Sequence, residues 1–284
     1  MVIGVQRHAC QLAVGGGPLL ILSTPVVPLA PNALTVDVAP HVTLGDAGLR
    51  AGQAVALSAG APSGHHADFR VTLEAASTWE PRPRVHRVVP RDLVDRLRIA
   101  RATVVAEGAG ESMLSLLWAS EAPALRPGVV CAASLPARLL SDAAIRRDPL
   151  SAARAARGLA GLGPGLTPSG DDLLTGFTAA WILVGESLGV DAVARERMTA
   201  AIVAGAERGA SPLGRAWLAH ARRGELLEPM TGFVAALLSA EPRDLGVAVR
   251  GALAVGSSSG TDWMVGFLLG AKAMLDDTTP GPPW

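Results

Sequence analysis

The stretch Ser169-Gly-Asp-Asp-Leu-Leu-Thr-Gly-Phe177 recurs further along the chain as Ser259-Gly-Thr-Asp-Trp-Met-Val-Gly-Phe267. The two copies share the pattern Ser-Gly-x-Asp-x-x-x-Gly-Phe, and each follows a loop of small residues and opens a long apolar run. Gly176 and Gly266 follow their aspartates by one helical turn, so each glycine shares a helix face with its aspartate. Glycine within a helix costs about 1 kcal/mol relative to alanine. Its presence in both copies therefore predicts that these two helices pack closely against each other.

The helical pattern extends outward from this repeat over most of the second half of the chain. Apolar residues recur at helical spacing, and the segments between them carry Gly, Pro, Ser or Asp. We predict helices over residues 92–106, 111–120, 135–145, 150–159, 171–188, 192–207, 212–223, 230–240, 244–255 and 262–275.

The first part of the chain has a different pattern. Short apolar runs punctuated by Gly and Pro, at residues 19–23, 33–38, 53–58 and 69–73, are typical of strands joined by turns. The sequence therefore predicts an α+β fold, with a small N-terminal antiparallel β-sheet or partial barrel followed by a mainly helical region. We expect a β-rich region over residues 1–90, a helical region with both loops over 91–276, and a proline-rich flexible tail over 277–284.

Composition narrows the classes of function. Hydrophobic residues make up 49% of the chain, but the apolar runs 177–184 and 263–271 end at charged residues, well short of the roughly 20 apolar residues of a membrane span. They predict buried core helices, and no basic segment leads into an apolar cleavage region at the N-terminus. We therefore expect no membrane association and no signal peptide.

Charge and cysteine content indicate neither nucleic acid nor zinc. Lys plus Arg and Asp plus Glu balance at 25 each, whereas nucleic-acid binding usually requires a clustered basic excess. Cys10 and Cys131 form no CxxC pair, which excludes a zinc site of that spacing. Two separate cysteines suit a reducing compartment, so we expect a cytoplasmic protein in which both are small buried hydrophobes.

The two loops have the composition of an anion site. A glycine-rich loop that enters a helix presents backbone N–H groups, the helix dipole favours negative charge there, and hydroxyls add donors. A P-loop is excluded because no GxxxxGK[ST] pattern occurs. We predict that the two loops form two walls of one site for a small anionic substrate, with contacts from Gly163, Gly165, Thr167, Ser169, Gly170, Ser211, Ser258, Ser259, Gly260 and Thr261.

The aspartates of these loops, Asp171, Asp172 and Asp262, leave three roles open. They could hold a cation such as Mg²⁺ that in turn binds the anion. They could act as a general base on a substrate N–H or O–H. They could also only cap the helices, since Ser followed by Asp resembles a capping box. The pair His65-His66 has ligand-type side chains, but no partner motif accompanies it.

The segment Gly161-Leu-Gly-Pro-Gly-Leu-Thr-Pro-Ser-Gly-Asp-Asp172 resembles the hallmark of the AllH-type family, and Gly256-Ser-Ser-Ser-Gly-Thr-Asp262 is similar to its second motif. The resemblance extends over about residues 10–275. The best-known member is one of three subunit types of an oxamate carbamoyltransferase in anaerobic allantoin degradation. This chain has Ser257-Ser258 where a His-Ser or His-Thr pair is common in the family, so any role of that histidine is in doubt here.

The resemblance implies a reaction in which oxalurate and phosphate exchange with oxamate and carbamoyl phosphate, in a complex with other subunits. Both sides of this reaction carry a carboxylate and a phosphate, which suits two anion-binding loops. Asp171 or Asp172 would serve as general base, and the loops would bind the leaving phosphate. The alternative is a non-catalytic subunit that only binds a ligand or a partner, which the lack of an evident nucleophile system favours.

Overall fold

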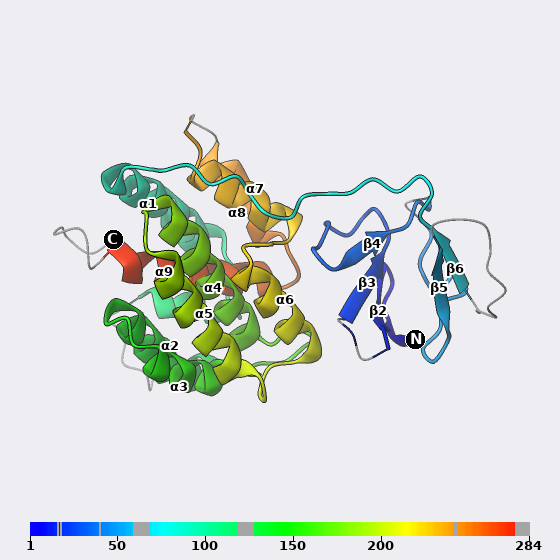
Figure 1. Ribbon diagram of the computed structural model, residues 1–284, viewed down its shortest axis with the longest axis horizontal. Helices are drawn as coiled ribbons and strands as arrows, with labels where there is room; N and C mark the ends of the chain where they lie inside the picture. Colours follow the sequence, from blue (N-terminus) through cyan, green and yellow to red (C-terminus); the bar gives the residue numbers. More distant parts are fainter. Residues whose placement is uncertain are drawn as a thin grey trace. The chain divides into compact units, whose positions relative to one another are not determined.

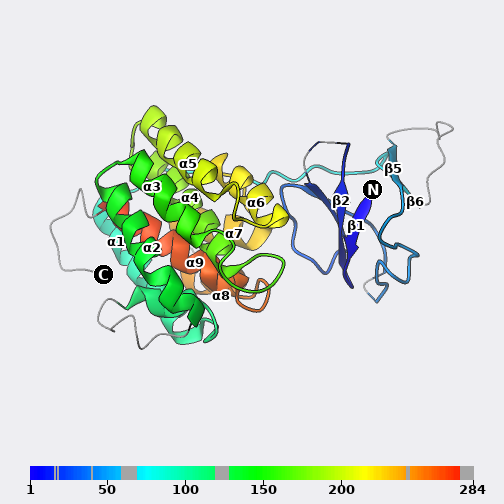
Figure 2. The same cartoon turned by 90° about the horizontal axis from the view of Figure 1, so that it is seen from below.

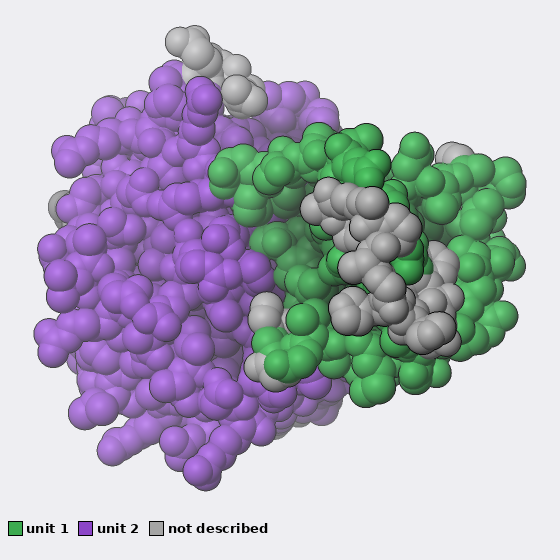
Figure 3. All heavy atoms as spheres, turned by 45° about the vertical axis from the view of Figure 1, so that its right-hand side comes forward, with its two compact units in different colours: residues 1–81 green, residues 82–284 purple. Residues whose placement is uncertain are grey.

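The computed structural model describes residues 1–15, 17, 19–39, 41–58, 69–118, 128–240 and 244–275. The chain divides into two compact units, residues 1–81 and residues 82–284, which are coloured separately in Figure 3. Each unit has a hydrophobic core of its own.

The first unit contains two small sheets. β1 (Val2–Val5), β2 (Ala9–Ala13) and β3 (Leu19–Ser23) pair antiparallel in sequence order, and β4 (Ala33–Thr35) adds to β3 in parallel. β5 (Val55–Ser58) and β6 (Phe69–Thr72) form a separate parallel pair. The core of this unit consists of Val2, Cys10, Leu12, Leu22, Leu44, Leu49 and Val71.

The predicted α+β class is confirmed, while the first sheet is mixed and not purely antiparallel. The chain leaves β3 through the turns at residues 24–32 and returns beside β3 in the same direction, so β4 pairs with it in parallel. The side chain of Asn32 fixes this return, because its amide donates to the carbonyl of Leu19 at 3.0 Å. Cys10 is buried as predicted, and Cys131 is exposed, which corrects the prediction that both are buried.

The second unit is helical. Two of its helices, α4 (Ser169–Ser187) and α9 (Ser259–Leu275), lie side by side at its centre in Figures 1 and 2. The other described helices surround this pair: α1 (Pro90–Glu107), the 3₁₀ helix η1 (Met113–Leu117), α2 (Gly128–Ile145), α3 (Pro149–Leu159), α5 (Ala192–Ala206), α6 (Pro212–Arg222), α7 (Glu228–Leu237) and α8 (Leu245–Leu253).

The helices α4 and α9 are buried on almost every side, as the long apolar runs within them predict. Glycines allow their backbones to approach closely. A Cβ atom on Gly176 would lie 1.9 Å from the carbonyl oxygen of Trp263, and one on Gly266 would lie 2.0 Å from that of Leu173. No side chain fits at either position, so the close pairing predicted from the repeated glycine is confirmed.

The sequence repeat is also a structural repeat. In each copy a short helix, a glycine loop and a long core helix follow one another, as α3–α4 and α8–α9. The amide of Gly170 donates to the carbonyl of Leu162 at 2.9 Å, and the amide of Gly260 donates to that of Val255 at 2.9 Å. In each copy, the glycine at the second position of the core helix is therefore bonded back to the end of the preceding helix or its loop.

The boundary between the units falls after Pro81, whereas the sequence placed the regional division after residue 90. The segment between these positions is bonded to the helical unit. Arg82 donates to the carboxylate of Glu186 and, at 2.6 Å, to the carbonyl of Arg223. The hydroxyl of Ser187 donates to the carbonyl of His86 at 2.6 Å. The predicted tail over residues 277–284 lies outside the described residues.

Among the described helices, α2 has the length and composition of a membrane span, with a mean hydropathy of 1.3 over 18 residues. Core helices of soluble proteins meet the same criterion, and 33% of this window is buried within the unit. The absence of membrane association stays a prediction.

Candidate functional site

The two glycine loops meet at the paired starts of α4 and α9. The hydroxyl of Thr167, just before α4, lies 3.1 Å from the hydroxyl of Ser259, the first residue of α9. Thr167 and Ser259 are half-buried, whereas Pro164, Gly165 and Ser257 are exposed. The loops therefore form a hydroxyl-bearing rim that reaches the surface of the helical unit.

Both loops contain glycine in a backbone conformation that other residues rarely adopt. Gly163 has a φ of 106° and Gly256 has a φ of 64°, a region that L-residues with side chains rarely adopt. A Cβ atom on Gly163 would also lie 3.0 Å from the backbone nitrogen of Ser169. The glycines thus turn each loop tightly back over the first turn of its core helix.

Asp172 lies beneath this rim and is almost completely enclosed. Its exposed fraction is 3%, and its Oδ2 atom has no hydrogen-bond partner. Burial is the main cause that raises the pKa of Asp172 well above its ordinary value, and the negative charge of Asp262 adds to the rise. Hydrogen bonds from the hydroxyls of Ser259 and Thr167 oppose it. Asp172 therefore keeps its proton to a higher pH than an exposed aspartate does, and its Oδ2 atom is available to accept or donate a further hydrogen bond.

Asp262 is the equivalent residue of the second copy. It is fully buried, its Oδ1 atom accepts the amide N–H of Met113 at 2.6 Å, and its Oδ2 atom has no partner. Burial raises the pKa of Asp262, while the Met113 amide and the hydroxyls of Ser169 and Ser258 lower it. One half of this carboxyl group is thus bonded to the protein, and the other half is unsatisfied.

Asp171 has a different position. Its two carboxylate oxygens accept the amide N–H groups of Gly161 and Ser211, each at 2.8 Å. Gly214 lies against the same carboxylate, since a Cβ atom there would be 2.3 Å from Asp171 Oδ2. Asp171 therefore joins the first loop to the start of α6, and the structure brings together only Asp172 and Asp262 of the three predicted acids.

Several of the predicted substrate contacts also have bonds within the protein. The hydroxyl of Ser211 caps α6 by accepting the amide of Gly214 at 2.9 Å. The hydroxyl of Thr261 accepts the amide of Ala109 at 3.0 Å. The amides of Gly170 and Gly260 are used in the backbone bonds described above. The hydroxyls of Thr167, Ser169, Ser258 and Ser259 are the ones that gather around the two buried acids.

The segment from the end of α1 to the first residue of η1 completes the base of this site, and the sequence did not identify it. Ala109 and Met113 donate their amides to Thr261 and Asp262. Each contact joins residues about 150 positions apart. The donors are backbone amides, which every residue except proline has, so the sequence at 109 and 113 does not reveal them.

Within the described ranges, no three His, Cys, Asp or Glu side chains are grouped closely enough to hold a metal ion. The candidate pair His65-His66 lies outside those ranges. The site contains two buried acids, each with a raised pKa and one oxygen without a hydrogen-bond partner. Such groups are rare elsewhere in folded proteins because they lower stability, and they are enriched at functional sites.

No solved structure matches the chain. The model of a family described as oxamate carbamoyltransferase subunit AllH matches residues 159–271. This match begins at the end of α3 and covers both glycine loops, Asp172 and Asp262, and most of α9. Over the segment that carries the candidate site, the chain is similar to the AllH-type family, which supports the resemblance found in its sequence.

Proposed function

We propose that this chain is a cytoplasmic subunit of an oxamate carbamoyltransferase-like enzyme and binds a small carboxylate, carbamoyl phosphate or both at the paired loops. The observation that carries the proposal is the Asp172–Asp262 pair. Each acid is buried under a rim of hydroxyls at the start of a core helix, and each has an oxygen without a partner. The family description supports the reaction class.

The raised pKa of Asp172 removes the main objection to an anionic substrate here. An ionised carboxylate would repel an anion, but a protonated carboxyl group is neutral and donates a hydrogen bond to it. The starts of α4 and α9 also place two positive helix dipole ends beside each other. Hydroxyl donors, helix dipoles and a neutral acid together favour a small oxyanion such as a carboxylate or a phosphate.

The same carboxyl group suits proton transfer in carbamoyl exchange. When oxamate attacks the carbamoyl carbon, its amide nitrogen must lose a proton, and ionised Asp172 would accept it. In the opposite direction, protonated Asp172 would return the proton to the departing nitrogen. A group whose pKa lies nearer neutrality performs both steps better than an ordinary aspartate. The helix starts would stabilise the phosphate that leaves or attacks.

A divalent cation would have two carboxylate ligands in this site. The unsatisfied Oδ2 atoms of Asp172 and Asp262 are the oxygens that could hold Mg²⁺, while both oxygens of Asp171 are already bonded. Mg²⁺ usually takes one or two protein carboxylates together with phosphate oxygens and water. We therefore propose that any Mg²⁺ enters together with the phosphate group of the substrate.

The alternative is a scaffolding subunit that contributes no catalytic group, and the exposed residues of α2 favour it. Leu135 is 56% exposed and Leu139 is 41% exposed on this helix, with Val129 and Ile145 also exposed. Apolar side chains gathered on one element are typical of protein interfaces. Other subunits of the complex are the partners that this alternative predicts.

Thermal unfolding of the purified chain tests the proposal. Phosphate, carbamoyl phosphate, oxamate and oxalurate are each added with and without Mg²⁺ to the wild type and to Asp172→Asn, Ser259→Ala and Asp148→Asn variants. A ligand at 100 times its Kd stabilises the folded state by about 2.7 kcal/mol. We expect at least one ligand to raise the unfolding temperature of the wild type and of Asp148→Asn, whose Asp caps α3 away from the site. The shift should disappear in the other two variants.

An unfolding temperature that no ligand changes, or one that rises equally in all four proteins, would contradict binding at the paired loops. The first result would favour the scaffolding alternative. Carbamoyl transfer by the chain alone, or by the reconstituted complex, then separates a catalytic subunit from a subunit that only binds.

A further inference from the structure

The two buried acids are connected crosswise between the core helices. Asp172 on α4 interacts with the hydroxyl of Ser259, the first residue of α9, and Asp262 on α9 interacts with the hydroxyl of Ser169, the first residue of α4. The charge of Asp262 also acts on Asp172. The two carboxyl groups therefore belong to one site between the paired helix starts.

Each of these carboxyl groups has one oxygen that is not used within the described part of the chain. The Oδ2 atoms of Asp172 and Asp262 are buried without a hydrogen-bond partner there, in side chains that are 3% and 0% exposed. A buried oxygen of this kind has lost its water without gaining a donor, which is costly and rare in folded proteins. Both atoms therefore indicate a ligand that bonds to them.

Asp262 is surrounded as a hydrogen-bond acceptor. Its Oδ1 atom accepts the amide N–H of Met113 at 2.6 Å, and the hydroxyls of Ser169 and Ser258 act on the same carboxyl group. These donors favour the carboxylate form, which accepts hydrogen bonds at both oxygens and donates none. The free Oδ2 atom of Asp262 therefore needs an N–H or O–H group from a ligand, and it would repel an anionic oxygen.

A small primary amide such as oxamate has the matching group. Its –NH₂ is uncharged and has two N–H groups, so one can donate to Asp262 while the other faces Asp172. The carboxylate at its other end suits the hydroxyl rim of Thr167 and Ser259 and the two helix dipole ends. The two ends of the ligand thus match two different surroundings in the site.

We propose that Asp262 makes the paired loops selective for primary amides, by accepting an N–H of the substrate –NH₂ group at its Oδ2 atom. This assignment rests on the function proposed above and adds the orientation of the substrate, with its amide toward the acids and its anionic end toward the rim. Proton transfer stays with Asp172. The bond between Thr167 and Ser259 spans the two loops, so the substrate enters when that bond opens.

Calorimetric titration of the full chain with oxamate and with pyruvate, at neutral pH in EDTA, tests this selectivity. Pyruvate has the same charge and nearly the same shape as oxamate, but a methyl group replaces the –NH₂. We expect the wild type to bind oxamate about 10- to 100-fold more tightly, because pyruvate leaves the buried Oδ2 atom without a donor. The EDTA keeps divalent cations away from both acids.

The Asp262→Asn variant should abolish or reverse this preference. Its amide oxygen can still accept the N–H of Met113, which places an –NH₂ donor where the Oδ2 atom was. The N–H of oxamate then meets another donor, whereas the methyl group of pyruvate meets no such conflict. We expect oxamate binding to weaken about 10-fold or more, and pyruvate binding to stay nearly unchanged.

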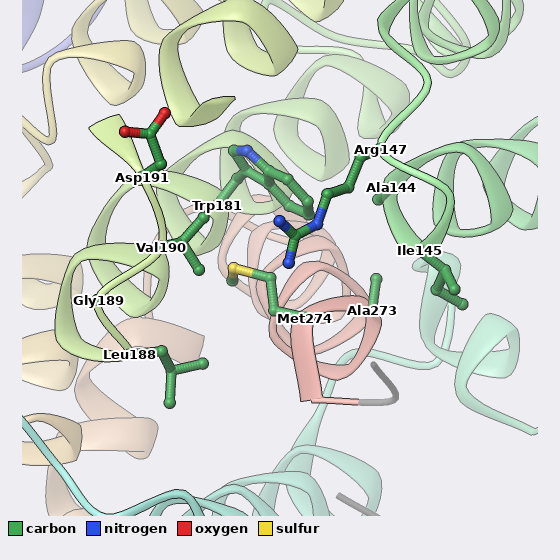
Figure 4. A pocket seen from close by; sticks show the side chains of 10 residues that line it. All are labelled: Ala144, Ile145, Arg147, Trp181, Leu188, Gly189, Val190, Asp191, Ala273 and Met274. Atoms are coloured by element: carbon green, nitrogen blue, oxygen red, sulfur yellow. The ribbon is translucent and has the colours of Figure 1, made fainter. Parts of the chain in front are cut away.

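Asp191→Asn is the matched control. Asp191 lies past the opposite end of α4, where it lines the pocket shown in Figure 4. Its Oδ1 atom caps α5 by accepting the amide of Ala194 at 2.9 Å. Because asparagine caps a helix as well as aspartate does, this variant should bind oxamate and pyruvate as the wild type does.

Three results would overturn the proposal. Equal binding of oxamate and pyruvate to the wild type would mean that a buried water, and not the substrate, satisfies the Oδ2 atom. Equal weakening of both compounds in Asp262→Asn would make Asp262 a structural residue. In these two cases the paired loops still bind an anion, and the proposed function stands. Binding of neither compound also refutes the proposal, and the unfolding shifts with carbamoyl phosphate and oxalurate then decide whether the proposed function fails with it.

Discussion

At the scale of single residues, Asp171 and Asp172 are neighbours in the chain, but their carboxyl groups have opposite surroundings. Asp171 uses both oxygens to hold backbone amides of Gly161 and Ser211. Asp172 is just as deeply buried, yet it keeps an oxygen without a partner. Asp171 therefore fixes the structure, and Asp172 retains the capacity to bind or transfer a proton.

Substitution separates these two roles. Asp171→Ala leaves two backbone N–H groups without a partner, and hydrogen bonds to a charged group contribute about 1.5–3 kcal/mol each. We expect it to lower the free energy of unfolding by about 3 kcal/mol in urea denaturation. Asp172→Asn should not lower it at neutral pH. If Asp172→Asn destabilised the chain as strongly as Asp171→Ala, both acids would be structural.

The raised pKa of Asp172 predicts a pH dependence. The folded chain holds this proton at pH values where the unfolded chain has lost it, so the free energy of unfolding falls as the pH rises from about 3.8 toward the raised pKa. Asp172→Asn removes this contribution. We expect its unfolding temperature to exceed that of the wild type by more at pH 8 than at pH 4. An equal difference at both pH values would show that Asp172 titrates alike in the two states.

The residue types at this site could be predicted, but their individual roles could not. The repeated motif marked Asp172 and Asp262 together with Ser169 and Ser259, and the loop before the first copy marked Thr167. The sequence named Asp171 as a candidate beside them. Its structural role was not visible there, because Gly161 and Ser211 bond Asp171 only through backbone amides, and Ser211 is 40 positions away. Contacts through the main chain leave no pattern in the sequence.

At the scale of helices and strands, the repeated glycines determine how α4 and α9 pack. Any side chain on Gly176 or Gly266 would meet the backbone carbonyl of the facing helix, which cannot rotate away. This contact explains why the sequence predicted that the two helices pair. Glycine destabilises a helix relative to alanine, and here the close approach of the facing backbone leaves no room for any other residue.

Alanine at these positions tests the packing. Gly176→Ala and Gly266→Ala should each lower the free energy of unfolding by about 3 kcal/mol or more, because overpacking against backbone forces the helices apart. Gly251→Ala is the matched control: this glycine lies within α8, and a Cβ atom there meets nothing within 4 Å. The control should stabilise the chain by up to about 1 kcal/mol. The close pairing of α4 and α9 would be contradicted if thermal and urea unfolding showed that Gly251→Ala destabilises the chain as much as the other two substitutions do.

The strands were harder to predict than the helices. β3 was predicted with its observed bounds, but β1 and β2 were not identified, because their runs are short and β1 contains Gly4. The parallel pairing of β3 with β4 depends on the path of the connection at residues 24–32. The residues of β3 and β4 alone therefore do not reveal whether the two strands run parallel or antiparallel.

At the scale of the whole molecule, the two units have separate cores, and the helical unit contains the paired loops. Glu186, Ser187 and Arg223, which bond the segment after Pro81, belong to the helical unit. The helical unit should therefore fold without the first unit.

A fragment of residues 82–284 tests this separation. We expect it to unfold cooperatively on heating and to keep the ligand-dependent rise in unfolding temperature of the full chain. A fragment that lacks a cooperative transition would show that the helical core depends on the first unit. The matching fragment that starts at residue 91 loses the contacts of Arg82 and His86 and should be less stable.

The measurement that tests the central claim most directly is the carboxyl ¹³C NMR titration of Asp172 in the full chain, with its signal identified by Asp172→Asn. We predict a titration midpoint above the ordinary value of 3.8, and a change in that midpoint when carbamoyl phosphate or oxamate binds beside it. An Asp172 signal that titrates near 3.8, and that neither ligand alters, would contradict a proton-carrying acid at the paired loops.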